Sequence, residues 1–136
     1  MFSPFETFEQ SCTRAFGFLR EQFGFDAPEV ERIGRESFVH FHKGARTVSI
    51  SWETGGPPSV ELFRPCAGTG LPPTPWAERD GVPYVRLFPR WPRSPEKRVR
   101  RHKDWNEPTA SIFDRSLEQQ AANLATMEQD FLSGTA

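Results

Sequence analysis

Residues 37–63, SFVHFHKGARTVSISWETGGPPSVELF, decide the fold of this chain. Apolar and polar residues alternate in the middle of the stretch: the apolar set is Val48, Ile50 and Trp52, and the polar set is Thr47, Ser49 and Ser51. Successive side chains of a β-strand point to opposite faces of a sheet. The alternation therefore predicts a strand at residues 46–53 with one apolar face and one solvated polar face.

The flanking sequence predicts further strands around this one. Residues 30–33, 37–43 and 59–63 have strand composition, and a fifth strand is plausible at 84–88. Gly44 allows a tight turn between the second and third strands, and TGGPP (54–58) forms the next turn. Short turns join neighbouring antiparallel strands, so we expect an antiparallel meander of four to five strands.

The N-terminal segment has the pattern of an amphipathic helix over residues 4–23. Ser3 can cap it, Pro4 suits its first position, Glu6 completes a capping box and Gly24 ends it. Residues at steps of three and four form one apolar stripe: Phe5, Phe8, Cys12, Phe16, Leu19 and Phe23. We expect this stripe, including the Cys12 thiol, to face the core.

The C-terminal segment repeats the pattern and ends at Gly134. Its apolar stripe consists of Phe113, Leu117, Ala121, Leu124, Met127 and Phe131. Two helices and a sheet that each have one apolar face pack most economically with both helices on one face of the sheet. The sequence thus predicts a single α+β domain over residues 1–136, with a Pro- and Arg-rich loop or insertion at about 65–108.

Length and composition exclude several classes of protein. A chain of 136 residues can bury a full core, and its two cysteines form no disulfide framework. The N-terminus has no signal-peptide pattern, and no apolar run reaches the ~18 residues that cross a bilayer. We therefore expect a cytoplasmic protein without contact with a membrane.

Charge is divided unevenly along the chain. Residues 86–104 contain eight Lys or Arg and two acids, a net charge of +6, whereas the other residues contain nine Lys or Arg and sixteen acids, a net charge of −7. Such a division predicts either internal ion pairing or a surface for a charged partner.

Three residues suggest enzyme chemistry without completing a site. His40 and His42 point to the same side of the predicted strand, outward if Val39 and Phe41 are buried, and two such histidines can bind zinc. Cys66 follows Pro65 in a Gly-rich loop and could act as a nucleophile beside a histidine. A third metal ligand for the histidines and an orienting group for Cys66 are not evident. The run GTG (68–70) lacks the features of a phosphate-binding loop. The carboxylates of Glu53, Glu61 and Glu78 are far apart in the sequence, and nothing in it shows that two of them meet in an acid/base site. We expect no cofactor and no enzyme, and keep a metal- or Cys-dependent hydrolase as an alternative.

The basic segment is the strongest candidate for binding. Tryptophan and arginine are the side chains that most often anchor interfaces, and we expect three tryptophans to be exposed beside arginines. The predicted binding residues are Trp76, Arg90, Trp91, Arg93, Arg98, Arg101 and Trp105. The part from Trp91 to Trp105 could also stack on bases and neutralise phosphates, so a nucleic-acid-binding module is the second hypothesis. The acidic remainder of the chain argues against it. A structural interpretation of the same segment is a short helix from Ser94 to Trp105, with solvated arginines and with Trp105 anchored on the core.

Several apolar patterns resemble those of small uncharacterised bacterial α+β proteins, some of which look like immunity proteins of toxin systems. The matching segments are FGF (23–25), FVHF (38–41), VSISW (48–52) and the C-terminal helix with FLSG (131–134). The similarity covers residues 1–63 and 112–136, has no counterpart to 65–108, and implies no catalytic residue.

These patterns together favour a small non-enzymatic protein-binding domain, for which the resemblance implies an immunity-type inhibitor. We expect the sheet surface and residues 65–108 to engage another protein, preferably an acidic one because the segment is basic. Association with further copies of the chain is an alternative.

Overall fold

The computed structural model describes residues 3–87 and 105–134. Helices lie at both ends of the chain and six strands lie between them, so the fold is α+β as predicted. The helices are α1 (Pro4–Ala15), α2 (Phe18–Phe23), α4 (Ala110–Met127) and α5 (Gln129–Ser133). The strands are β1 (Glu29–Ile33), β2 (Glu36–Lys43), β3 (Arg46–Glu53), β4 (Ser59–Pro65), β5 (Glu78–Arg79) and β6 (Val82–Leu87).

All strands pair antiparallel in the order β1-β2-β3-β4-β6-β5. The antiparallel sheet is confirmed, and β1 to β4 follow one another as a meander, whereas β6 lies between β4 and β5. The expected count of four to five strands is wrong because β5 was missed. Its signal is the pair Asp80-Gly81, where both residues have positive φ (53° and 78°). Such pairs form the two-residue turn that closes a hairpin, although a strand of only two residues shows no alternation.

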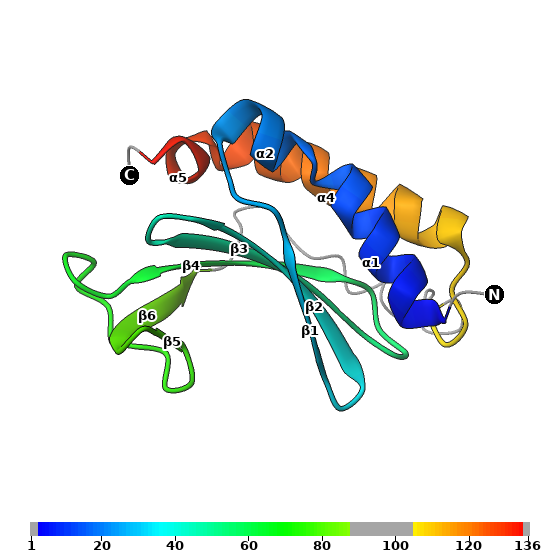
Figure 1. Ribbon diagram of the computed structural model, residues 1–136, viewed down its shortest axis with the longest axis horizontal. Coiled ribbons are helices and arrows are strands. Elements are labelled where there is room, and N and C mark those ends of the chain that lie inside the picture. The colour runs from blue at the N-terminus through cyan, green and yellow to red at the C-terminus, as the bar shows by residue number, and fades with distance from the viewer. Residues whose placement is uncertain (1–2, 88–104, 135–136) are drawn as a thin grey trace.

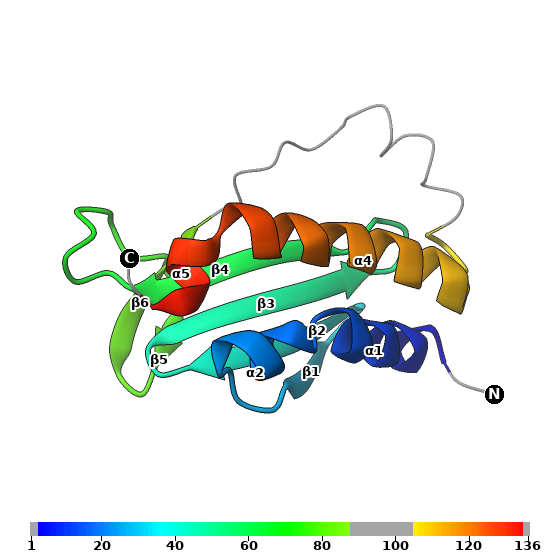
Figure 2. The same ribbon diagram turned by 90° about the horizontal axis from the view of Figure 1, so that it is seen from above.

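The helices and the sheet form two layers. Figure 1 shows α1, α2, α4 and α5 on one side of the sheet, whose two edges, β1–β2 and β5–β6, curl away from them. In Figure 2, α4 lies along β4 and β3, and α1 lies beside it over β2. No helix in residues 3–87 and 105–134 is long and apolar enough to cross a membrane.

The first helix is interrupted, which corrects the single helix expected over residues 4–23. Ser3 caps it as predicted, since its Oγ accepts from the Glu6 N–H at 3.2 Å. α1 nevertheless ends at Ala15, and α2 starts again after Gly17. Glycine disfavours helix interiors, and the break leaves both Phe16 and Leu19 fully buried.

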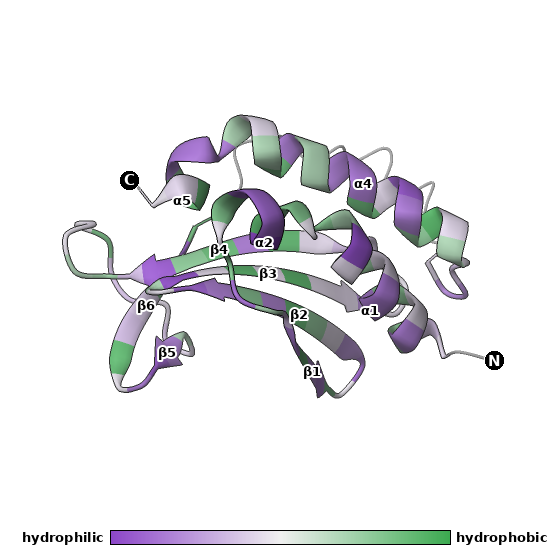
Figure 3. Cartoon of the chain, turned by 45° about the horizontal axis from the view of Figure 1, so that its top comes forward, coloured by the Kyte–Doolittle hydropathy of each residue, from purple (hydrophilic) through white to green (hydrophobic). Residues whose placement is uncertain are grey.

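The C-terminal helix is also interrupted, at Glu128. Met127 was expected on the buried stripe and is instead 43 % exposed. After the interruption at Glu128, Phe131 is buried as predicted, and Leu132 is buried in addition. Hydrophilic and hydrophobic residues otherwise alternate along α4 with the spacing of an amphipathic helix (Figure 3).

One cluster of buried side chains joins the helices to the sheet. It contains the predicted apolar residues of β2 and β3 and the predicted Cys12, whose pKa is raised by burial and by the nearby Glu9 carboxylate. Its centre is aromatic: the Phe113 ring lies 5.1 Å from Trp52, 5.6 Å from Trp105 and 5.7 Å from Phe8, between ring centroids. Packing of this kind contributes most of the stability of a small domain.

Candidate functional site

The side of the sheet away from the helices is the candidate site, and we name it the open face. Its members follow from the strand registers, which place residues that pair directly on the same face. They are Glu29, Glu31 and Ile33 of β1; Glu36, Phe38, His40 and His42 of β2; Thr47, Ser49, Ser51 and Glu53 of β3; Ser59, Glu61, Phe63 and Pro65 of β4; Val82, Tyr84 and Arg86 of β6; and Arg79 of β5.

The polar side of β3 is buried rather than solvated, which corrects the expectation of one wet face. Thr47, Ser49 and Ser51 are only 4–6 % exposed. Side chains of the two adjacent strands contact them: His40 and His42 of β2, and Ser59 of β4. Each hydroxyl is satisfied by a neighbour: Ser51 Oγ, for example, lies 3.1 Å from Ser59 Oγ. Buried hydroxyls with partners cost little stability.

Two rows of polar side chains cross β1, β2 and β3. In the first row, His40 Nδ1 lies 2.7 Å from Ser49 Oγ, and His40 Nε2 lies 3.0 Å from Glu31 Oε1. In the second row, His42 Nδ1 lies 2.8 Å from Thr47 Oγ1, and its Nε2 lies 3.5 Å from a carboxylate oxygen of Glu29. Both histidines thus lie on the face opposite Val39 and Phe41, as predicted, and each one links an edge strand to the central strand.

The surroundings of His42 in the second row disfavour its charged form. Burial is the main cause that lowers the pKa of His42, and the charges of Arg79 and His40 act in the same direction against the Glu29 carboxylate. Arg79 is held in place by a hydrogen bond from its Nη1 to the Gly44 carbonyl oxygen at 3.1 Å.

The first row has the connectivity of a hydroxyl, a base and an acid, but it lacks the other requirements of a nucleophilic site. Ser49 is 4 % exposed in the middle of a strand that is paired on both sides. Its neighbouring backbone N–H groups belong to those ladders, whereas acyl transfer needs donors directed at a developing oxyanion. We interpret both rows as links that fix the curl of the sheet.

The histidines and Cys66 are not joined by any contact in the described part of the chain. The described residues contain no group of three or more His, Cys, Asp and Glu that could hold a metal ion. Cys66 begins the loop after β4, and its N–H bonds the Pro83 carbonyl at 3.1 Å. This loop therefore ties β4 to β6 and forms no site with His40 and His42.

Carboxylates gather at one end of the open face. Glu36 pairs directly with Glu53 across β2 and β3. Burial, followed by the charges of Glu53 and Glu61, raises the pKa of Glu36. Glu61 is bound by Arg86 at 3.0 Å, so this arginine neutralises one carboxylate of the group. Among the described residues, the open face has five glutamates and two arginines, Arg79 and Arg86.

An exposed tryptophan lies where the open face meets the loop before β5. Trp76 is 62 % exposed, although its ring packs edge-on against Phe63 at 5.6 Å and carries the Arg86 guanidinium 5.2 Å above it. We name these three residues the Trp76 corner. Trp76 was predicted from sequence as an exposed binding residue, and its exposure is confirmed. Its partners Phe63 and Arg86 were missed, because only the strand register brings them together.

The binding hypothesis expected Trp105 to be exposed as well, which is wrong; the structural interpretation of the segment, with Trp105 anchored on the core, is correct for this residue. Trp105 is 1 % exposed, packs against Phe113, and its carbonyl accepts from the Gly55 N–H at 2.9 Å. The Trp105 indole therefore belongs to the core. The other predicted binding residues, namely Arg90, Trp91, Arg93, Arg98 and Arg101, lie outside the described residues.

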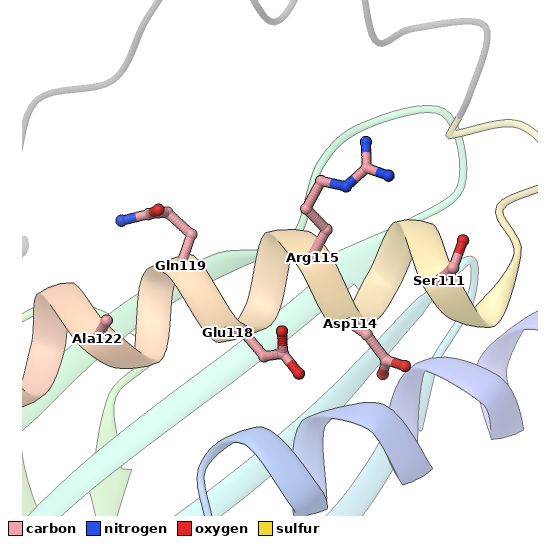
Figure 4. Close-up of a pocket in the computed structure, with 6 residues that line it drawn as sticks. All are labelled: Ser111, Asp114, Arg115, Glu118, Gln119 and Ala122. Atoms are coloured by element: carbon pink, nitrogen blue, oxygen red, sulfur yellow. The ribbon is translucent and has the colours of Figure 1, made fainter.

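A shallow depression on α4 offers a weaker site. Figure 4 shows its lining, all from one helix: Ser111, Asp114, Arg115, Glu118, Gln119 and Ala122. Asp114 is already engaged with α1, where its carboxylate accepts from the buried Ser11 hydroxyl and from Arg14 at 3.0 Å. Side chains that diverge from a single helix do not converge on a ligand, so we assign no binding role to this depression.

Comparison with known proteins gives no relative: no family model, no curated protein and no solved structure matches this chain.

Proposed function

We propose that this chain is a non-enzymatic protein-binding domain that recognises its partner with the open face and the Trp76 corner. The observation that carries the proposal is a large aromatic side chain that stays 62 % exposed while Phe63 and Arg86 hold its ring in place. Tryptophan and arginine dominate binding energy at protein interfaces. A ring that is already immobilised loses little conformational entropy when a partner covers it.

The surroundings of Trp76 support a protein partner over a small molecule. The open face is a broad sheet surface whose central hydroxyls are already satisfied by hydrogen bonds. Small-molecule sites are instead enclosed and have a few convergent polar groups. Leu71 and Val82 are also exposed near this end of the sheet, at 48 % and 44 %, and they extend the apolar surface that a partner would bury.

The immunity-type inhibitor that the resemblance implies is one form of this proposal, since such a protein acts by covering the surface of its partner. The acidic partner predicted from the charge of residues 86–104 stays a prediction for that basic segment. The buried Trp105 weakens the nucleic-acid hypothesis, because one of its two stacking tryptophans is fully enclosed.

Site-specific photo-crosslinking in the native cells tests the proposal. A photoreactive amino acid is placed at Trp76, and the control carries it at Met127, which is exposed on α4. We expect one protein to be crosslinked from position 76 and none from position 127, with the adduct suppressed by excess wild-type chain and not by excess Trp76→Ala chain. Equal crosslinking from both positions, or none from either, would contradict the proposal.

A further inference from the structure

In the part of the chain that the structure describes, strand β1 forms a free edge of the sheet. It is the first strand in the order, and all five of its residues are exposed. The apolar side chains of Val30 and Ile33 are 52 % and 59 % exposed. An edge of this kind presents unpaired backbone donors and acceptors on which another strand can build.

The register of the β1–β2 hairpin identifies the free backbone groups. Ile33 pairs with Glu36 across the two-residue turn of Gly34 and Arg35, in which Gly34 has a φ of 58°. Residues that flank such a turn form a hydrogen-bonded pair, and bonded and non-bonded pairs then alternate along the hairpin. The N–H and C=O groups of Val30 and Arg32 therefore point away from β2.

We propose that β1 accepts an extended segment of a basic protein partner as a seventh strand of the sheet. This inference rests on the proposed protein-binding function and names the chemistry of the partner. The backbone groups of Val30 and Arg32 supply the hydrogen bonds, and the side chains of β1 select the sequence.

Charge on β1 determines the preferred partner. Glu29 and Glu31 lie on the open face, where Glu29 pairs with His42 and Glu31 with His40, and their side chains stay 71 % and 54 % exposed, respectively. A residue directly opposite a carboxylate on an adjacent strand is favoured when it is basic. Arg32 is on the other face and is already bound by both carboxylate oxygens of Glu9, at 2.7 and 2.8 Å. The carboxylates of Glu29 and Glu31 therefore favour Lys or Arg at alternate positions of the added strand.

The same charges disfavour a second copy of β1 as the added strand. If two copies of β1 pair antiparallel with Glu31 at the centre of the pair, the two Glu31 side chains lie directly opposite each other. If Val30 is at the centre, Glu29 of each copy lies opposite Glu31 of the other. A pair centred on Arg32 opposes two arginines. Like charges directly opposite destabilise a strand pair, so the β1 edge is protected against self-association and open to a basic strand.

Titration of the full chain with two synthetic peptides tests the inference. One peptide alternates Lys and Val, and the other alternates Glu and Val. We expect the Lys peptide to slow hydrogen exchange at the amides of Val30 and Arg32, and the Glu peptide to leave both unchanged. Equal binding of the two peptides, protection at another edge, or protection of these amides by self-association without peptide would overturn the inference.

Two variants separate a backbone contact from a general attraction between charges. Val30→Pro removes a free-edge N–H and no bond to β2, so it should weaken binding of the Lys peptide about tenfold, the equivalent of one lost hydrogen bond. Circular dichroism checks that the variant stays folded. The double variant Glu29→Lys and Glu31→Lys should reverse the preference and bind the Glu peptide; unchanged preference would contradict the proposed pairing.

These outcomes are distinct from those of the crosslinking experiment. If Trp76 crosslinks one partner whereas Val30→Pro changes nothing, the proposed function holds and the β1 inference fails. If β1 binds the Lys peptide but no partner crosslinks at Trp76, the proposed function fails at that corner instead.

Discussion

The two sides of β3 are buried to a similar degree by different means. Val48, Ile50 and Trp52 are covered by helices from both ends of the chain, whereas Ser49 and Ser51 are shielded by side chains of the adjacent strands. The helix side depends on long-range apolar packing, and the open face depends on local hydrogen bonds. Most of the free energy that stabilises the fold therefore comes from packing on the helix side of β3. The open face contributes less to stability and is available for recognition.

The largest loss of stability is expected where the helices meet the sheet. Phe113 is fully buried and contacts Trp52, Trp105 and Phe8. Phe113→Ala should lower the free energy of unfolding by about 3–5 kcal/mol, measured by urea denaturation. Phe113→Leu is the control and should cost less, because it fills part of the space. A loss below about 1 kcal/mol in the alanine variant would show that the core is centred elsewhere.

The joint between α1 and α4 should have the next largest effect. Asp114→Ala leaves the buried Ser11 hydroxyl without its acceptor, so we expect a loss of about 1–3 kcal/mol. Ser11→Ala combined with Asp114→Ala should cost less than the sum of the two single variants. Arg14→Ala, at an exposed partner of the same carboxylate, should cost under about 1 kcal/mol. Strict additivity in this cycle would show that Ser11 and Asp114 do not interact.

Substitution of His42 on the open face should change how the free energy of unfolding depends on pH, and should cause no large loss of stability. The pKa of His42 is lowered in the folded chain, so the unfolded chain takes up the proton first as the pH falls. Its contribution is fully present above the ordinary value of 6.5 and is lost as the pH falls through 6.5 toward the lower folded pKa. Urea midpoints between about pH 5 and 8 should decline less steeply in His42→Gln. Parallel profiles for both chains would rule out this histidine as the cause.

The smallest effect is expected at Met127, which the helical periodicity wrongly placed in the core. Met127→Ser should change the free energy of unfolding by no more than about 0.5 kcal/mol, because the side chain is exposed. Phe131→Ser is the matched comparison, since Phe131 is buried one turn later. If both variants lower the free energy of unfolding equally, Met127 is buried like Leu124, and the exposure described for it is wrong.

Period-two and helical patterns were sufficient to predict the two layers, because a strand or helix that is buried on one face has apolar residues at regular intervals in its sequence. They failed where geometry changes between periodic segments, at Gly17 and Glu128, and where a strand is too short to alternate, as in β5. Trp105 could not be assigned from sequence, since a basic neighbourhood does not tell whether one indole turns inward.

The candidate site was predictable only in part, for a related reason. Sequence identified Trp76, and it placed His40 and His42 outward. It could not identify Glu29, Glu31 or Arg86 as their neighbours, because these residues come from other strands and meet through the register. Registers become predictable once hairpin turns are recognised, and the turn at Gly34 would have placed Glu31 near His40.

Lysine substitution at two adjacent positions of β3 tests most directly whether the sheet has one covered and one open face. Ile50→Lys places a charge beneath the helices and should cost at least about 4 kcal/mol, whereas Ser51→Lys can extend its ammonium group to solvent from the open face and should cost about 1 kcal/mol. Urea denaturation of the two variants should show this difference. Equal destabilisation would mean that both faces are covered, and would contradict the account.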